Sequence, residues 1–496
     1  MTQTQSQTQS QTEAAKAGGR KLVIEPVTRV EGHGKVTIHL NEAGEVVQSR
    51  LHIVEFRGFE RFMQGRPFWE LPVAVQRLCG ICPVSHHLAA SKAVDAFVGG
   101  RPTPTAEKMR RLMHYGQVFQ SHALHFFHLC SPDLLFGFDA QVAKRNVFGV
   151  AAEFPDLAKQ GILMRKWGQE IIKATAGKKV HGTGAIPGGI NKNLSLAERD
   201  ALLADLEQMK AWARGALEIA KDYTLEHVEV AKVFGTFPSS HMCLVREDGA
   251  LDLYDGLLRA VDAEGEVVFD GVDNQRYSDY ILEGVKSWSY MKFPFIRSIG
   301  PEDGWYRVGP LARINACTYI DTPEAEEARK DFLAVTDGKP NPMSLAYHWT
   351  RMIEVLHAAE KIEELLHDPD LQGTDLVDTS GERKLESVGI IEAPRGTLFH
   401  HYRIHEDDTV AMANLIVSTT SNNEPMNRAV RLVAERYLGG RPEITEGMLN
   451  HVEVAIRAYD PCLSCATHAM GKMPLVVELY DHEDALVDRR SKGLDS

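Results

Sequence analysis

Apolar and polar positions along the chain follow two different periods. Over most of the chain the apolar residues recur every three or four positions, which is the spacing of one helix face. This pattern predicts helices at residues 82–96, 105–129, 196–227, 345–366, 427–438 and 445–458. Shorter alternating stretches predict strands at 35–40, 45–54, 266–269 and 410–417, a strand and turn at 389–401, and a strand at 474–479. The predicted fold is therefore mainly α with small β additions (α+β), in a single interlocked helical body.

The two ends of the chain differ from this body. Residues 1–18 are rich in Gln, Thr and Ser and have no apolar pattern, so we expect a disordered tract. No run approaches eighteen apolar residues, so no membrane span is expected, and no signal-peptide pattern opens the chain. The formal net charge of −13 argues against nucleic acid as a partner.

The predicted helix at residues 105–129 carries four histidines, and Thr105 at its start is placed to cap it. These histidines are His114, His122, His125 and His128. His125 and His128 share a face that a metal could use, but packed, hydrogen-bonded histidines are the commoner reason for such a pattern. The glycine-rich residues 180–193 lack the spacing of a phosphate-binding loop, so a plain loop is predicted there.

Two Cys-x-x-Cys pairs dominate the candidate chemistry of a chain with seven cysteines. Cys79 and Cys82 lie near its start, and Cys462 and Cys465 near its end. Two intervening residues let both sulfurs of a pair face one metal. A zinc ribbon usually keeps its two pairs close in sequence, whereas almost the whole chain separates these. The spacing favours one interior catalytic site, with a structural zinc site as the alternative.

The residues around the cysteines resemble the paired signatures of nickel–iron hydrogenase large subunits. Arg77 precedes the first pair, and Asp460, Pro461 and His468 frame the second. Further stretches match the family in its order: residues 28–33, 56–60 and 392–396. The resemblance spans about residues 20–468 and makes 19–468 one domain. Residues 21–26 and 288–294 are most similar to the branch of NAD-reducing, bidirectional soluble hydrogenases, which implies a cytoplasmic location.

The resemblance implies a nickel–iron centre held by the four cysteines. Cys79 and Cys462 would bind nickel terminally, and Cys82 and Cys465 would bridge nickel and iron. Iron would carry carbonyl and cyanide ligands that do not come from the protein. The implied reaction is the reversible, heterolytic cleavage of dihydrogen, in which a terminal thiolate such as Cys462 takes the proton.

Other residues acquire expected roles from the same resemblance. Glu31 would relay the proton from Cys462, and Arg395 would overhang the metals. Pro394, Asp460, His86 and Thr419 match residues that surround the centre. Ser121 and Ser418 depart from the family pattern, because many members have aspartate and proline at these positions. The carboxylate network around Arg395 is therefore expected to be thinner.

A magnesium site, several partners and a processing step are also implied. Glu60, His468 and a main-chain carbonyl near Leu415 match magnesium ligands. Electrons would leave through an iron–sulfur small subunit to flavin- and NAD-binding subunits, since the chain has no fingerprint for these cofactors. Nickel-insertion proteins and a maturation endopeptidase would act on the chain, and the endopeptidase would remove residues 469–496.

Three other interpretations stay open from the sequence. A hydrogenase large subunit could serve another electron acceptor. A zinc-stabilised scaffold subunit would use the same cysteines for structure alone. A non-catalytic subunit of a respiratory proton-pumping complex is a hydrogenase relative that has lost these cysteines, and the four intact residues argue against it.

Overall fold

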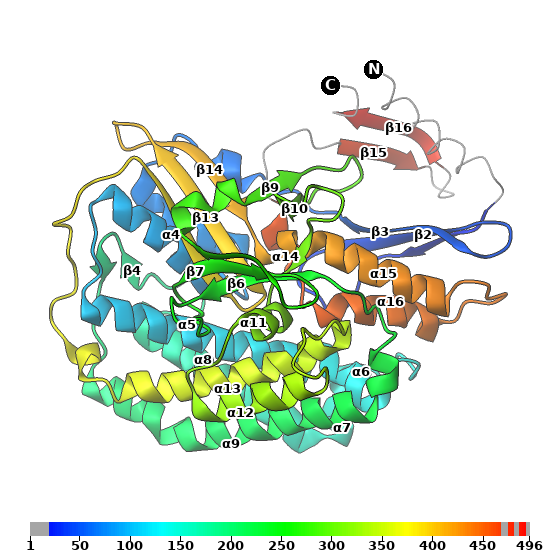
Figure 1. Ribbon diagram of the computed structural model, residues 1–496, viewed down its shortest axis with the longest axis horizontal. Helices are drawn as coiled ribbons and strands as arrows, with labels where there is room; N and C mark the ends of the chain where they lie inside the picture. The colour runs from blue at the N-terminus through cyan, green and yellow to red at the C-terminus, as the bar shows by residue number, and fades with distance from the viewer. Residues whose placement is uncertain (1–18, 468–474, 481–485, 493–496) are drawn as a thin grey trace.

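A layer of long helices forms one half of the molecule. The computed structural model describes residues 19–467, 475–480 and 486–492. The layer consists of α5 (Pro104–Leu124), α8 (Pro155–Ala176), α9 (Leu196–Glu226), α12 (Pro323–Ala334) and α13 (Tyr347–Leu366), in the lower half of Figure 1. The central helix α13 packs against α5, α9 and α12, and most of its side chains are buried. The core helix predicted at residues 345–366 is thereby confirmed.

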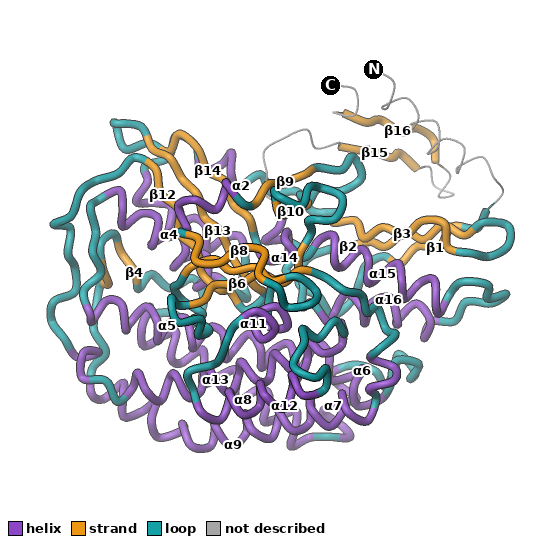
Figure 2. Tube along the Cα trace, in the orientation of Figure 1, coloured by secondary structure: helices purple, strands orange, loops and turns teal. Residues whose placement is uncertain are grey.

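Small sheets lie over this helical layer, as the orange strands of Figure 2 show. One antiparallel sheet has the order β1 (Lys21–Ile24), β2 (Gly34–Leu40), β3 (Val46–Ile53). A second has the order β12 (Glu386–Ala393), β13 (Gly396–Ile404), β14 (Val410–Ile416) and packs on α4 (Pro83–Phe97). A four-stranded sheet has the order β11 (Tyr306–Arg307), β6 (Ser240–Val245), β7 (Leu257–Val261), β8 (Val267–Val272). The α+β prediction is confirmed.

The remaining elements are short and connect these layers. They are α2 (Phe59–Met63), α3 (Leu71–Ala74), α6 (Ser131–Phe136), α7 (Val147–Glu153), α10 (Val228–Ala231), α11 (Pro310–Ala316), α14 (Ser418–Ser421), β4 (Ala185–Ile186), β5 (Gly189–Ile190), β9 (Ile281–Gly284) and β10 (Phe293–Ile296). Turns of tighter helix add η1 (Phe68–Glu70), η2 (Val75–Leu78), η4 (Asn274–Asp279), η5 (Ser344–Ala346), η6 (Pro369–Gln372) and η7 (Ser464–Ala466).

The helix predicted at residues 105–129 differs from the structure at both ends. Thr103, not Thr105, caps α5: its hydroxyl accepts a hydrogen bond from the Ala106 N–H, and Pro104 occupies the first turn. At the other end α5 stops at Leu124 and continues as a π-helical turn, η3 (His125–Cys130). Such turns insert an extra residue into a helix and are frequent at functional sites.

The chain returns to the N-terminal sheet through two helices near its end. The first is α15 (Asn423–Tyr437), which packs on β3, and the second is α16 (Glu446–Ala458), which packs on α15. A hairpin of β15 (Leu475–Tyr480) and β16 (Leu486–Lys492) follows, at the upper right of Figure 1. In the described part of the chain, no helix is both long and apolar enough to cross a membrane.

Candidate metal centre

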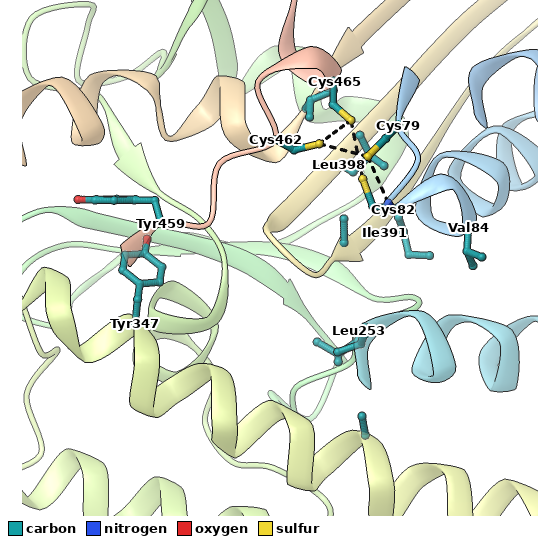
Figure 3. Close-up of a cluster of buried hydrophobic side chains, with 14 of the residues drawn as sticks. Cys79, Cys82, Val84, Leu253, Tyr347, Ile391, Leu398, Tyr459, Cys462 and Cys465 are labelled. Carbon is teal, nitrogen blue, oxygen red and sulfur yellow. Dashed lines mark hydrogen bonds between the residues drawn. The ribbon is translucent and has the colours of Figure 1, made fainter. Parts of the chain in front are cut away.

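The two cysteine pairs come from opposite ends of the chain and meet in the interior. Cys79 follows the tight turn η2, and Cys82 precedes Pro83, the first residue of α4. Cys462 and Cys465 lie in the segment after α16, which leaves the helix at Asp460 and Pro461. In Figure 3 both segments point their sulfurs at one another, beside Leu398 and above Ile391. The predicted meeting of the two pairs is confirmed.

The sulfur atoms are close enough to bind a common metal cluster. The Sγ atoms of Cys79 and Cys462 are 3.3 Å apart, and those of Cys82 and Cys465 are 3.8 Å apart. Cys462 Sγ lies 2.9 Å from Cys465 Sγ, and all four sulfurs lie within 4.8 Å of one another. All four residues are buried. Thiolates at this spacing suit nickel, iron and zinc.

Main-chain hydrogen bonds fix the second pair against the N-terminal sheet. Glu31 and Cys462 form an isolated parallel bridge, and the Leu463 N–H donates to the Glu31 carbonyl at 2.9 Å. Further along, the Arg57 N–H donates to the Thr467 carbonyl at 3.0 Å. Gly32 lies against this segment, because a Cβ there would be 2.7 Å from the Ser464 nitrogen. The last residues before position 468 are therefore part of the core.

The electrostatics of the four thiols favour a cation among them. Burial works against ionisation, yet hydrogen bonds from the other three thiols hold the pKa of Cys79 well below its usual value. Burial and the neighbouring sulfurs raise the pKa of Cys462 and of Cys465 well above the usual value. The protein alone thus stabilises one thiolate, and a bound metal would stabilise the others. The donor set fits a thiolate-bound metal centre.

Glu31 is in direct contact with the cysteine cluster, where its predicted role requires it. The Cys462 thiol donates to Glu31 Oε2 at 3.0 Å, and the Ser464 N–H donates to the same oxygen at 3.2 Å. The Ser464 hydroxyl donates to the other carboxyl oxygen. Burial, followed by the charge of Cys79, raises the pKa of Glu31, which suits a group that accepts and releases protons.

Arg395 lies over the cluster at the tip of the hairpin formed by β12 and β13. Its Nε donates to the Asp460 carbonyl at 2.6 Å, and Nη2 donates to Asp460 Oδ1 at 3.0 Å. Nη1 is 3.4 Å from the hydroxyl of Ser121, where many relatives were expected to have a carboxylate. Burial disfavours the charged guanidinium, but Asp460 and the sulfurs raise the pKa of Arg395 well above its usual value. The side chain is therefore a fixed cation.

The remaining residues of the predicted surround also lie at the cluster. Cys82, His86, Pro394, Arg395, Thr419 and Cys462 line a cavity of about 10 Å³. The Thr419 hydroxyl accepts a hydrogen bond from the Cys462 N–H at 2.9 Å. The His86 Nδ1 is 3.1 Å from the His400 Nε2, so its ring is held from the side of β13. A cavity of this size has room for a very small molecule.

The predicted magnesium ligands lie partly within the described residues. Glu60 is buried, and its Oε1 accepts a hydrogen bond from the Leu415 N–H at 3.0 Å. The Lys292 ammonium is 3.8 Å from the same oxygen. A buried carboxylate beside a main-chain segment suits a hard cation, which would compete with the Lys292 ammonium for this oxygen. His468 lies outside the described residues, so this ligand stays a prediction.

The histidines of the predicted helix are mainly core residues that make hydrogen bonds. The Nε2 atoms of His114 and His125 pair with the carbonyls of Glu392 and Arg457, and that of His122 pairs with Glu354. His125 also lies within 4.8 Å of Cys130 and His348 through possible ligand atoms. Arg351, 3.4 Å from the His348 ring, places a positive charge beside this group and disfavours a metal there.

Some residues that shape the site are absent from the sequence-based prediction. Ser464 lies inside the second Cys-x-x-Cys motif, so its position next to the ligands was a usable signal. Arg313, which contacts the Arg395 hairpin, and Glu354, which binds Arg313, belong to no motif. No signal in the sequence marks them, because only the fold brings them to the hairpin.

Comparisons with known proteins agree with this geometry. Residues 57–147 and 241–468 match the family described as nickel-dependent hydrogenase, and residues 21–56 match one described as HoxL-like. The β subunit of the NAD-reducing hydrogenase HoxS of Cupriavidus necator is 52% identical, over 95% of this chain and all of its own. The matching chain of the F420-non-reducing hydrogenase of Methanothermobacter thermautotrophicus is 42% identical, over 95% of this chain and 99% of its own.

A solved structure has the same fold. The crystal structure of an NAD⁺-reducing [NiFe]-hydrogenase in the H2-reduced state superposes with a TM-score of 0.89 at 56% identity. The match covers 90% of this chain and 99% of that one. Sequence, fold and the buried four-cysteine cluster thus agree, and the chain belongs to the nickel-dependent hydrogenase family.

Proposed function

We propose that this chain is the catalytic large subunit of an NAD-reducing nickel–iron hydrogenase, which reversibly oxidises dihydrogen. The observation that carries the proposal is the buried cluster of Cys79, Cys82, Cys462 and Cys465, with every sulfur within 4.8 Å of the others. Two relatives named NAD-reducing match 95% and 90% of this chain, and they support the choice of NAD as the electron acceptor.

The four cysteines Cys79, Cys82, Cys462 and Cys465 would hold nickel and iron. When bound, this centre supplies the place where dihydrogen is split heterolytically. The iron ligands expected from the family are carbonyl and cyanide. A four-thiolate donor set also accepts zinc, so the metals have to be identified by measurement.

The protein residues around the centre have separate tasks in this proposal. The Cys462 thiolate accepts the proton, and Glu31, 3.0 Å from that sulfur, carries it away. Arg395 keeps a positive charge over the cavity, where it orients the substrate and the ligands of the metals. Asp460, Pro394, His86 and Thr419 fix this surround. Glu60, the Leu415 main chain and His468 would bind magnesium behind the centre.

The electrons need partner proteins. Among the described residues the other cysteines are Cys130, Cys243 and Cys317, which form no cluster of cysteines. An iron–sulfur small subunit would therefore accept the electrons and pass them to a module that binds flavin and NAD. A complex of this kind works in the cytoplasm, where NAD is reduced.

Maturation is the last part of the proposal. Nickel-insertion proteins would load the site, and an endopeptidase would then cut after His468. Two observations support the cut: residues 460–466 are buried, and the family match ends at residue 468. The match to the solved relative also covers 99% of that chain but only 90% of this one. Intact mass tests this step, since active protein should end at His468, whereas active full-length protein would contradict it.

Metal analysis of the purified complex tests the main proposal. Nickel and iron at about one each per chain, together with hydrogen-dependent reduction of NAD, are the expected result. Zinc alone would support a structural scaffold, and absence of metal would support a non-catalytic role.

A large subunit that serves another electron acceptor is the second candidate. The 42% identity to a chain of an F420-non-reducing hydrogenase favours it. Hydrogen uptake with an artificial acceptor but without NAD would identify this case.

A further inference from the structure

The guanidinium of Arg313 has all of its hydrogen-bond donors occupied next to the Arg395 hairpin. Arg313 lies on α11 and is fully buried. Its Nε and Nη2 donate to the two carboxyl oxygens of Glu354 on α13, both at 2.6 Å. Nη1 donates to Glu392 Oε2 at 2.8 Å and to the Ala393 carbonyl at 2.9 Å, and Nη2 donates to the Pro394 carbonyl at 3.1 Å. Five donors thus serve two carboxylates and two carbonyls.

The two carbonyls belong to the turn that carries Arg395. Glu392 pairs with Thr397 and Ala393 with Gly396, so Pro394 and Arg395 are the turn of the β12–β13 hairpin. Inside the protein, a carbonyl without a donor costs about 1–3 kcal/mol. Arg313 donates to both carbonyls from below, while the Arg395 side chain extends to Asp460. The backbone of the hairpin tip is therefore tied to α11 and α13.

Glu354 also connects with the opposite side of Arg395. Its Oε2 accepts a hydrogen bond from the His122 Nε2 at 2.9 Å. His122 is the neighbour of Ser121, whose hydroxyl is 3.4 Å from Arg395 Nη1. The Glu354 carboxylate therefore binds both Arg313, which supports the hairpin, and His122, whose neighbour Ser121 contacts the Arg395 guanidinium.

Arg313 and Glu354 both stay ionised at neutral pH. Burial raises the pKa of the Glu354 carboxyl, but the Arg313 guanidinium outweighs burial and the pKa falls to about 2. The Glu354 and Glu392 carboxylates raise the pKa of Arg313 above its usual value, although burial opposes this. The contact is thus a permanent, charge-assisted clamp.

We propose that Arg313 and Glu354 are positioning residues for Arg395, which they hold at a fixed height over the four sulfurs by clamping the Pro394–Arg395 turn. The assignment rests on the proposed function. It explains how a hydrogenase site keeps Arg395 in place when Ser121 stands where many family members have an aspartate. Neither residue touches the cavity, so both act through Arg395.

Arg313→Lys is the direct test, in the complete enzyme. Lysine keeps the charge for Glu354, but its three donors on one nitrogen do not reach both carboxyl oxygens and both carbonyls. We expect full nickel and iron content and a fall in kcat of about 100-fold, because a displacement of about 1 Å at an active site has such an effect. The KM for dihydrogen should change by less than about twofold, since the Arg395 cation acts on charge that develops as dihydrogen is split, and the bound molecule is neutral.

A second readout follows the metal ligands without turnover. Arg395 lies next to the place expected for the iron-bound carbonyl and cyanide groups, so their infrared stretching bands should shift in Arg313→Lys. A role in stability alone would lower the unfolding temperature and leave these bands unchanged.

Arg110→Lys is the matched control. Arg110 is also fully buried, binds Asp95 with two hydrogen bonds and donates to the carbonyls of Ile186 and Gly189. Its partner Asp95 lies near the C-terminal end of α4, away from Cys82 and His86 at the start of that helix, and the Ile186 and Gly189 carbonyls belong to no residue of the site. The control should lose a similar amount of stability while kcat and the infrared bands remain those of the wild type.

The outcomes separate this inference from the proposed function. Wild-type kcat and bands in Arg313→Lys, or equal losses in Arg110→Lys, would overturn the positioning role alone. Wild-type protein without nickel would overturn the proposed function and the positioning role with it. If Arg313→Lys does not fold, the triple variant Arg313→Met, Glu354→Met, Glu392→Gln removes the arginine together with both of its carboxylate partners and leaves no buried charge. The same fall in kcat and the same band shift are then expected, and their absence contradicts the proposal.

Discussion

Glu31 joins the two ends of the chain through both its main chain and its side chain. Its carbonyl accepts from Leu463, and its carboxyl accepts from Cys462 and Ser464. The side chain could therefore support the cysteine segment or carry protons from it. The two roles differ in what they require, since support needs only hydrogen bonds, whereas transfer needs a group that binds and releases a proton.

Glu31→Gln separates these roles. The amide keeps the size of the side chain and a hydrogen-bond acceptor, but it cannot take up the proton. We expect hydrogen uptake to fall by about 10²- to 10⁴-fold, the usual contribution of a proton-transfer group, at unchanged nickel content. Uptake with an artificial acceptor and metal analysis of the same sample measure both quantities.

Ser464→Ala serves as the control for Glu31. It removes one hydrogen bond to the carboxyl and leaves the carboxyl itself, so activity should stay within about tenfold of the wild type. Loss of nickel in Glu31→Gln, in parallel with its activity, would make Glu31 a structural residue.

The sequence predicted the ligand residues better than the residues around them. The cysteines lie in motifs whose spacing follows from the geometry of metal binding, and Glu31 was assigned from the resemblance to the hydrogenase family. Arg313 and Glu354 lie 41 positions apart, and Arg313 lies 81 positions from Pro394. Their interaction depends on how α11, α13 and a hairpin pack, and no local pattern encodes such packing.

Among the elements, local periodicity predicted those with a simple pattern. The strands at 35–40 and 410–417 and the helices at 196–227 and 445–458 agree with β2, β14, α9 and α16. No element was predicted at residues 155–176, where the structure has α8. Gly161 and Gly168 interrupt the apolar face of this helix. A Cβ at Gly161 would lie 2.3 Å from Phe127, and one at Gly168 would lie 2.7 Å from Gln120, so neither position has room for a larger residue. Only the position of the neighbouring helix explains these glycines.

The loop at Gly32 offers a prediction about how the last segment docks. Gly32 has φ +83°, and a Cβ there would lie 2.7 Å from the Ser464 nitrogen and 2.9 Å from the Leu463 side chain. Gly32→Ala should therefore push the cysteine segment away from β2, with nickel content well below one per chain. Metal analysis and circular dichroism of the purified variant measure docking and folding.

Gly65→Ala is the matched control for Gly32. Gly65 has φ +79°, but its Cβ would meet nothing within 4 Å. The backbone strain, about 1–2 kcal/mol, is then the same while the clash is absent. Full nickel in Gly65→Ala and lost nickel in Gly32→Ala are expected, and equal nickel in both would show that the close contact at Gly32 is unimportant for docking.

At the scale of the whole molecule, buried histidines make the fold sensitive to acid. Burial lowers the pKa of six fully buried rings to about 3 or 4: His87, His114, His122, His241, His348 and His357. In the unfolded chain the same rings take up protons near pH 6.5. Between these values the unfolded state binds more protons, so stability falls as the pH falls.

Urea unfolding at pH 7 and pH 5 tests this sensitivity. Each ring contributes a slope of up to about 1.4 kcal/mol per pH unit below pH 6.5, and almost nothing above pH 7. His241→Asn should reduce the slope by about that amount, because it removes one of the titrating rings. His241 suits the test, since it is far from any predicted ligand in sequence and pairs with Asn315. A midpoint that is equal at both pH values would contradict the picture of neutral, buried rings.

The distance between the cysteine pairs also matters while the protein is being made. Cys79 and Cys462 are 383 positions apart. At about 5–20 residues per second, a ribosome needs roughly 20–80 s to pass from one to the other. During that time the first pair is a two-thiol fragment open to any thiophilic ion in the cell. Slow or stalled translation of the intervening codons lengthens the time for which only half of the donor set is present.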